Sequence, residues 1–225
     1  MQLRIRYNIE SEQQRIQKTL EKLSWYEQMG YRPRFPEGID PHNDTLDKIF
    51  KAVQNEFDIN QYQQAATRLT NDINSVQRDF FSTLQTMLQK ELPEVIEIQL
   101  TKYGVGGSYS LPNTVILNIN MKSSINTVLH EMTHLIVEPY IQEYKLEQNE
   151  KERLVDLILT SGDISLAKYE IQERGLMYKN IMDPLFKECF HKSPEQFFRA
   201  YAKRRTLNTN AAQHGLTGST SLHGA

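Results

Sequence analysis

The most informative feature of this chain is the pentad His130-Glu131-Met132-Thr133-His134, because the residues around it predict that it lies on a helix that follows a strand. Residues 114–119 are rich in β-branched and apolar side chains and predict a strand just before it. Apolar residues then recur at helical spacing: Ile125, Val128, Leu129, Met132, Leu135 and Ile136. Residues four apart share one face of a helix, so both histidines point the same way. Pro139 is expected to end this helix, since proline disfavours helical geometry at the residue before it.

Two imidazoles on one helical face, with a glutamate between them, are typical of a metal site with a base beside it. His130 and His134 can bind one zinc ion, while Glu131 lies next to it without ligating. Zinc lowers the pKa of a bound water to about 7, so Glu131 can accept its proton as a carbonyl is attacked. The pentad therefore predicts zinc-dependent hydrolysis of a peptide or protein. The alternative is a core helix whose histidines are merely solvated or hydrogen-bonded.

A third ligand must come from elsewhere in the chain. The residues after the pentad lack the His-x-x-Gly-x-x-His continuation, which excludes the metzincin pattern. Apolar periodicity predicts a second helix over residues 150–159, on which Glu152 and Asp156 share one face. Glu138 continues the four-residue spacing of the histidines, and Glu147 and Glu150 are further candidates. A ligand from a second element closes a zinc site best, which favours Glu152 over Glu138.

At these residues the chain resembles the gluzincins, zinc peptidases in which HExxH precedes a glutamate ligand on a separate helix, typically in a Glu-x-x-x-Asp arrangement. The resemblance implies that Glu152 is the third zinc ligand. It also implies that Asp156 hydrogen-bonds the outer nitrogen of a ligand histidine, with His130 as the first choice, which would fix its tautomer. Lys151 stands where thermolysin-like enzymes often have Asn, so the match to that subgroup is incomplete.

Upstream, residues 95–100 alternate as a strand with one buried face, and a glycine-rich run follows from Tyr103 to Ser110. This part resembles the small sheet before the active helix of gluzincins, including minigluzincins, whose edge strand holds substrate by main-chain pairing. Glycines there would let a peptide backbone approach closely. A simple glycine turn in a hairpin is the alternative. The run lacks Gly-Lys-Ser/Thr and any G-x-G-x-x-G, so it is not a nucleotide loop.

A donor that stabilises the oxyanion is expected close to the metal. Tyr144 is the first choice for this catalytic role, because gluzincins often carry such a group in the connection between the ligand helices. Other candidates exist: Tyr109, Tyr140, Tyr178 and His191.

The fold class expected is α+β and predominantly helical. It would be zincin-like, with a small mixed sheet preceding the HExxH helix and a helical C-terminal half. Residues 1–92 would form an N-terminal helical region, with helices at about 45–57 and 61–91. Residues 93–205 would form the catalytic region. Residues 206–225, dominated by Asn, Thr, Ser, Gly and Ala, are expected to be a disordered tail.

The composition limits which binding partners and which cellular compartment are expected. A formal net charge of -2 gives no electrostatic support for binding nucleic acid or an anionic membrane. The single cysteine, Cys189, cannot form an intrachain disulfide, and no apolar run reaches the roughly 20 residues of a membrane span. No signal peptide is evident, so a cytoplasmic location is expected, with signal-less secretion left open.

Two rival functions stay open at this point. One is a non-catalytic helical interaction protein with a structural zinc or none. The other is a zinc hydrolase acting on a non-peptide amide or ester, because water activation alone does not choose the acyl substrate.

Overall fold

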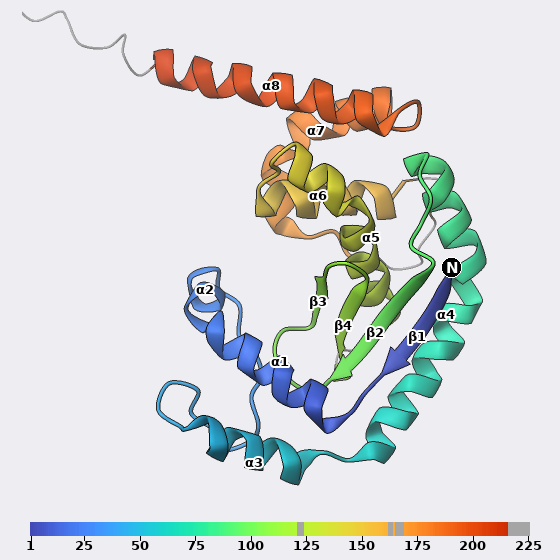
Figure 1. Cartoon of the computed structure of the whole chain (residues 1–225). Helices are drawn as coiled ribbons and strands as arrows, with labels where there is room; N and C mark the ends of the chain where they lie inside the picture. Colours follow the sequence, from blue (N-terminus) through green and yellow to red (C-terminus); the bar gives the residue numbers. More distant parts are fainter. Residues whose placement is uncertain (121–123, 162–163, 165–168, 216–225) are drawn as a thin grey trace, which may run out of the picture. The chain divides into compact units, whose positions relative to one another are not determined.

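The computed structural model describes residues 1–120, 124–161, 164 and 169–215. The first part of the chain (Figure 1) contains β1 (Gln2–Arg6), α1 (Ile9–Glu21), α2 (Leu23–Gln28), α3 (Leu46–Glu56), α4 (Ile59–Leu88), β2 (Val95–Thr101), β3 (Gly107–Ser110) and β4 (Thr114–Asn118). The second part contains α5 (Ser124–Glu143), α6 (Gln148–Leu159), the 3₁₀-helix η1 (Glu173–Tyr178), α7 (Lys179–Leu185), the π-helix η2 (Phe186–Phe190) and α8 (Pro194–Gly215). The predicted α+β, predominantly helical class is confirmed, while its zincin-like character stays a prediction.

The four strands form one mixed sheet in the order β1-β2-β4-β3. β1 and β4 both pair with β2 in parallel, and β3 pairs with β4 in antiparallel orientation. In β2 the fully buried side chains Ile96, Ile98 and Leu100 alternate with half-buried ones, which confirms the predicted strand with one buried face. β3 is therefore an edge strand of this sheet, with β4 as its neighbour.

The chain divides into two compact units, and the division passes through α4 and α5. Unit 1 comprises residues 1–82 and 92–137, and unit 2 comprises residues 83–91 and 138–225. The predicted boundary between residues 92 and 93 stays a prediction. The predicted tail is helical at its start, because α8 continues to Gly215, and residues 216–225 lie outside the described residues.

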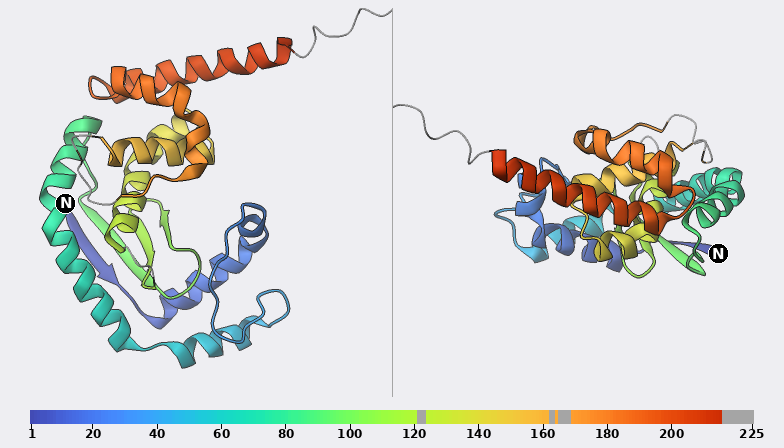
Figure 2. Two further views of the ribbon diagram at one scale, coloured as in Figure 1. Left: turned by 180° about the vertical axis from the view of Figure 1, so that it is seen from behind. Right: turned by 90° about the horizontal axis from the view of Figure 1, so that it is seen from above.

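Unit 1 is built around the sheet and the N-terminal helices. A side-chain and backbone capping box at Asn8 and Ser11 starts α1, and Thr45 caps α3. A cluster of buried side chains joins these helices to the segment after β2: Ile16, Ile49, Val53 and Tyr103. The long helix α4 runs beside the sheet at β1, as both views show (Figures 1 and 2).

Glu12 of α1 is a buried carboxylate that ties three elements of unit 1 together. It accepts hydrogen bonds from the hydroxyls of Tyr62 on α4 and Thr101 on β2, and from the backbone N–H of Lys102 at 2.8 Å. Burial raises the pKa of Glu12, and these hydrogen bonds oppose the rise.

Unit 2 has an aromatic core. Stacked and edge-to-face rings from η2 and α8 fill it: Phe186, Phe190, Phe197, Phe198 and Tyr201. A buried ion pair joins α6 to α7, since the Nε and Nη2 atoms of Arg153 donate to the two carboxylate oxygens of Asp183. The helix predicted over residues 150–159 is confirmed by α6.

The expectation that Pro139 ends the HExxH helix is wrong. α5 continues through Pro139 to Glu143. Proline removes one backbone donor and crowds the preceding turn, at a penalty of about 3 kcal/mol in a helix interior. Here Pro139 is exposed, and buried Ile141 and Leu146 hold the following turn in place. Burial of these apolar side chains offsets the local penalty.

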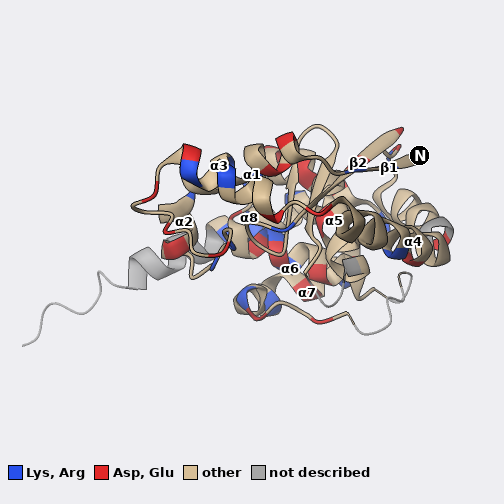
Figure 3. Ribbon diagram, turned by 90° about the horizontal axis from the view of Figure 1, so that it is seen from below, with Lys and Arg blue, Asp and Glu red and all other residues tan. Residues whose placement is uncertain are grey.

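Charge is mixed along the chain. Figure 3 shows basic and acidic residues together on α3 and at several other places, in keeping with the small net charge. Among the helices of the described residues, none combines the length and the apolar character that a bilayer span requires.

Candidate metal centre

α5 brings His130 and His134 into direct proximity, as their spacing predicts. Both are buried, with 7% and 3% of their surface exposed. Their Nε2 atoms are 3.0 Å apart, and their rings meet edge to face with an interplanar angle of 77°. Two nitrogen ligands on a tetrahedral zinc at about 2.0–2.1 Å would be about 3.3 Å apart. The two imidazoles thus converge on one point at nearly the separation that a shared ion requires.

Glu152 of α6 completes a group of three potential ligands. One ligand atom from each of His130, His134 and Glu152 lies within 4.8 Å of the others, and all three residues are buried. This is close enough to bind one metal ion. The amide of Gln148, one helical turn earlier, donates to Glu152 Oε1 at 2.5 Å and so orients the carboxylate. Two neutral nitrogens and a carboxylate are donors that a divalent transition metal accepts.

Glu150 and Glu147, which the sequence left open as ligands, have other partners. Glu150 is fully buried, and its Oε1 accepts from the hydroxyl of Tyr201 at 2.5 Å. Its Oε2 accepts from the backbone N–H of Glu147 and from Arg205, each at 2.7 Å. Both oxygens of Glu150 therefore serve the packing of α6 against α8.

Glu138, the remaining alternative, accepts a hydrogen bond from Gln142 one turn later at 3.1 Å. It does not belong to the group formed by the two histidines and Glu152 in the described part of the chain. Spacing on α5 alone would have chosen Glu138, whereas the folded chain brings in the glutamate of the second helix.

Asp156 is completely buried and accepts two hydrogen bonds within unit 2. Its Oδ1 accepts from the hydroxyl of Tyr169 at 2.7 Å, and its Oδ2 from the backbone N–H of Gln172 at 2.9 Å. These contacts anchor the segment before η1 to α6, one turn after Glu152. The predicted hydrogen bond between Asp156 and His130 stays a prediction.

Glu131, the predicted general base, lies against the start of β3. A Cβ added to Gly107 would be 2.7 Å from Glu131 Oε1 and 2.6 Å from the methyl carbon of Thr127. Both distances are too short for a real side chain. Gly107 therefore leaves room for the carboxylate of Glu131, a reason for glycine that differs from the predicted approach of a substrate backbone.

Arg15 of α1 is a buried cation that the sequence did not single out. It is 5% exposed, and its Nε and Nη2 atoms have no acceptor among the described residues. A Cβ at Gly104 would lie 2.5 Å from Nε, so the guanidinium packs directly against the glycine loop. Burial lowers the pKa of Arg15, while Tyr26, Glu12 and Glu131 oppose that shift. The carboxylate of Glu131 therefore acts electrostatically on this buried cation.

Tyr109 of β3 contacts a member of the metal-binding group. Its ring stacks on the imidazole of His134, with centroids 5.4 Å apart and planes within 8° of parallel. Only the folded structure shows this contact, because nothing in the sequence aligns residue 109 with residue 134.

The other oxyanion candidates have different surroundings. Tyr144 and Tyr140 both stack on Phe198, with centroids 5.3 Å and 4.7 Å away. A hydrogen bond with Tyr144 is the main cause that raises the pKa of Arg199. Tyr178 donates to Glu147 at 3.3 Å, within unit 2. A catalytic role for Tyr144 stays a prediction.

His191 lies edge-on to Phe186, with centroids 5.8 Å apart and an interplanar angle of 75°. This contact belongs to the aromatic core of unit 2, which is the structural role expected of a histidine outside a motif.

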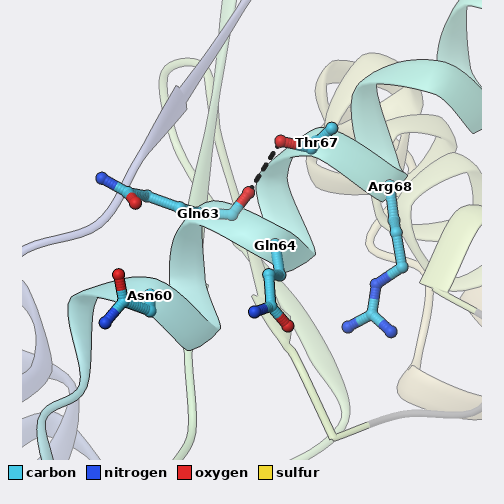
Figure 4. Close-up of a pocket in the computed structure, with 5 residues that line it drawn as sticks. All are labelled: Asn60, Gln63, Gln64, Thr67 and Arg68. Carbon is cyan, nitrogen blue, oxygen red and sulfur yellow. Dashed lines mark hydrogen bonds between the residues drawn. The ribbon is translucent and has the colours of Figure 1, made fainter.

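A hollow on the surface lies apart from this centre along the chain. Five side chains of one helix, α4, line it (Figure 4): Asn60, Gln63, Gln64, Thr67 and Arg68. The hydroxyl of Thr67 is already bonded to the backbone carbonyl of Gln63 at 2.9 Å. The hollow contains none of the metal-binding group, so we assign the chemistry to the histidine and glutamate cluster.

Searches found no protein-family model, no curated protein and no solved structure that matches this chain.

Proposed function

We propose that this protein is a zinc-dependent metallopeptidase of the gluzincin type. The observation that carries the proposal is the buried group of His130, His134 and Glu152, with Glu131 between the histidines. A structural zinc site usually closes all four positions with protein, often with cysteine. Three ligands and an adjacent carboxylate instead match a catalytic zinc site, which keeps one position for water.

The donor set supports zinc in particular. Two imidazoles and one carboxylate are the ligands of several catalytic zinc sites, and the separation of the Nε2 atoms suits tetrahedral coordination. Zinc, when bound, would polarise the substrate carbonyl and lower the pKa of its water. We propose one zinc ion per chain.

The remaining steps belong to residues of the chain. Glu131 would accept the proton of the attacking water and donate it to the leaving amine, which makes this residue both base and acid. Its carboxylate packs against the backbone of Gly107, so little freedom is lost when it meets the water. An oxyanion donor is still required, and Tyr144 is retained as the candidate for it.

The decisive experiment measures zinc content and peptide hydrolysis in purified wild type and in His134→Ala, Glu152→Ala and Glu131→Gln. We expect about one zinc per chain in wild type and Glu131→Gln, and much less in the two ligand variants. Hydrolysis should be lost in all three variants. Glu138→Ala is the matched control, because it removes a buried glutamate outside the group and should retain zinc.

Equal zinc in all variants, or none in wild type, would end this proposal and favour the interaction protein. Zinc binding together with hydrolysis of esters but not peptides would favour the non-peptide hydrolase. We also propose a cytoplasmic location and peptide or protein as the substrate, without nucleic-acid or membrane partners. Cell fractionation tests the first of these, and a peptide library tests the second.

A further inference from the structure

β3 contacts the metal-binding helix at two positions that matter for the chemistry. Gly107 packs on Glu131, and Tyr109 stacks on His134. Residues two apart on a strand face the same side and are separated by about 6.6 Å, while residues three apart on a helix are separated by about 4.5 Å along its axis. The two spacings differ by only about 2 Å, so one short strand can contact both Glu131 and His134. All of the contacting residues lie in unit 1.

The stacking geometry restricts the His134 ring. An imidazole on a helix rotates about its terminal torsion unless neighbours fix its plane. Tyr109 covers one face of His134 nearly in parallel, and the edge-to-face contact with His130 sets the direction of the Nε2 edge. Together these contacts leave the ring with little rotational freedom.

We propose that Tyr109 is a positioning residue of the metal centre. Its ring fixes the plane of His134, so that Nε2 stays directed at the ion, and the phenol itself is not a ligand. The inference rests on the proposed function, because it takes His134 as a zinc ligand.

The test compares zinc dissociation constants, measured by competition with a chromophoric chelator, in wild type, Tyr109→Phe, Tyr109→Leu and Tyr140→Leu. Phe keeps the stacking ring, so Tyr109→Phe should bind zinc within about twofold of wild type. Leu removes it, and loss of a residue that orients a ligand typically weakens metal binding about 10–100-fold. Tyr140 is the matched control, because it also stacks on an aromatic ring but its partner, Phe198, is no ligand.

A second readout separates positioning from general destabilisation. The visible spectrum of the cobalt(II)-loaded protein reports ligand geometry, and it should change in Tyr109→Leu but not in Tyr109→Phe or Tyr140→Leu. Circular dichroism establishes that each variant is folded. Should the Leu variant not fold, Tyr109→Val, which has high strand propensity, takes its place.

Wild-type zinc affinity and an unchanged cobalt spectrum in Tyr109→Leu would overturn the positioning role while leaving the peptidase proposal intact. Equal losses in Tyr109→Phe and Tyr109→Leu would overturn stacking as its cause. Equal losses in Tyr140→Leu would reduce the effect to stability. A wild type that binds no zinc would overturn both this inference and the proposed function.

Discussion

Gly107→Ala is the substitution that tests most directly how Glu131 is held. The added Cβ would lie 2.7 Å from Glu131 Oε1, 2.9 Å from its Cγ and 2.6 Å from the methyl carbon of Thr127. Carbon atoms in contact are separated by about 3.5–4.0 Å, so the neighbours must move by about 1 Å. The backbone of β3 is held by β4, which leaves the Glu131 side chain to give way.

Two effects follow, one on the stability of the fold and one on turnover. Overpacking a well-filled site destabilises the fold by about 1–3 kcal/mol. A misplacement of about 1 Å at a catalytic group can lower turnover about 100-fold, which corresponds to about 2.7 kcal/mol in the activation barrier. We therefore expect Gly107→Ala to fold and to bind zinc, but to hydrolyse peptides about 100-fold more slowly than wild type.

The assay combines urea unfolding, zinc analysis and turnover of a cleavable peptide. Gly38→Ala is the control for an added methyl group that meets no neighbour, because nothing lies within 4 Å of its Cβ; its φ of +71° adds a backbone strain that Gly107 does not have. Adding Thr127→Ser to Gly107→Ala removes the methyl overlap and should recover stability without recovering turnover. If Gly107→Ala turned over peptides within about twofold of wild type, the reasoning about Glu131 would be refuted.

Three further predictions concern buried charges. Replacing Arg15 by Met should raise the free energy of unfolding by about 1 kcal/mol in urea, because an apolar chain of similar length avoids burying guanidinium atoms that lack a hydrogen-bond acceptor among the described residues. Burial raises the pKa of Glu12 above its ordinary value, so the folded state binds this proton more tightly, and wild type should gain stability relative to Glu12→Gln as the pH falls toward the ordinary glutamate pKa of about 4.3. Asp183→Ala should lower the free energy of unfolding by about 3–5 kcal/mol in the same assay. It removes the carboxylate that pairs with the guanidinium of Arg153, whose side chain is only 5% exposed.

Each of these three predictions can be contradicted by a particular result. A less stable Arg15→Met would show that the buried cation is held by favourable interactions. Parallel pH profiles for wild type and Glu12→Gln would mean that Glu12 titrates normally in the folded state. For the ion pair, Glu195→Ala breaks the exposed bridge to Arg199 and should change stability by less than about 1 kcal/mol. A comparable loss in Asp183→Ala and Glu195→Ala would contradict the role of burial.

Local features of the fold could be predicted from the sequence. The periodicity around the pentad identifies α5, and the alternation over residues 95–100 identifies β2. The end of α5 could not be predicted, because Pro139 favours termination locally while burial of Ile141 and Leu146 decides otherwise. Propensity is thus overridden where a tertiary contact supplies more free energy than the local penalty removes.

The residues of the candidate site also divide into those that the sequence could predict and those that it could not. His130 and His134 follow from spacing on one helix, and Glu152 followed from a resemblance that also implies a second helix. Arg15 carried no motif and was missed, because it meets the centre only through segments far apart in sequence. Tyr109 was named only as one of the alternatives to Tyr144 for the oxyanion donor, and its contact with His134 could not be predicted for the same reason.

The pairing of β1 with β2 affects how the chain can fold while it is being synthesised. Leu3 lies beside Ile96, so the first strand must wait for the second to emerge from the ribosome. Synthesis adds about 5–20 residues each second, which makes this delay roughly 5–20 s. During it, the hydrogen-bonding edge of β1 lacks its partner and is a template for wrong pairing. His130 and Glu152 are synthesised later still, so the group of potential metal ligands is incomplete for the whole time that β1 waits for β2.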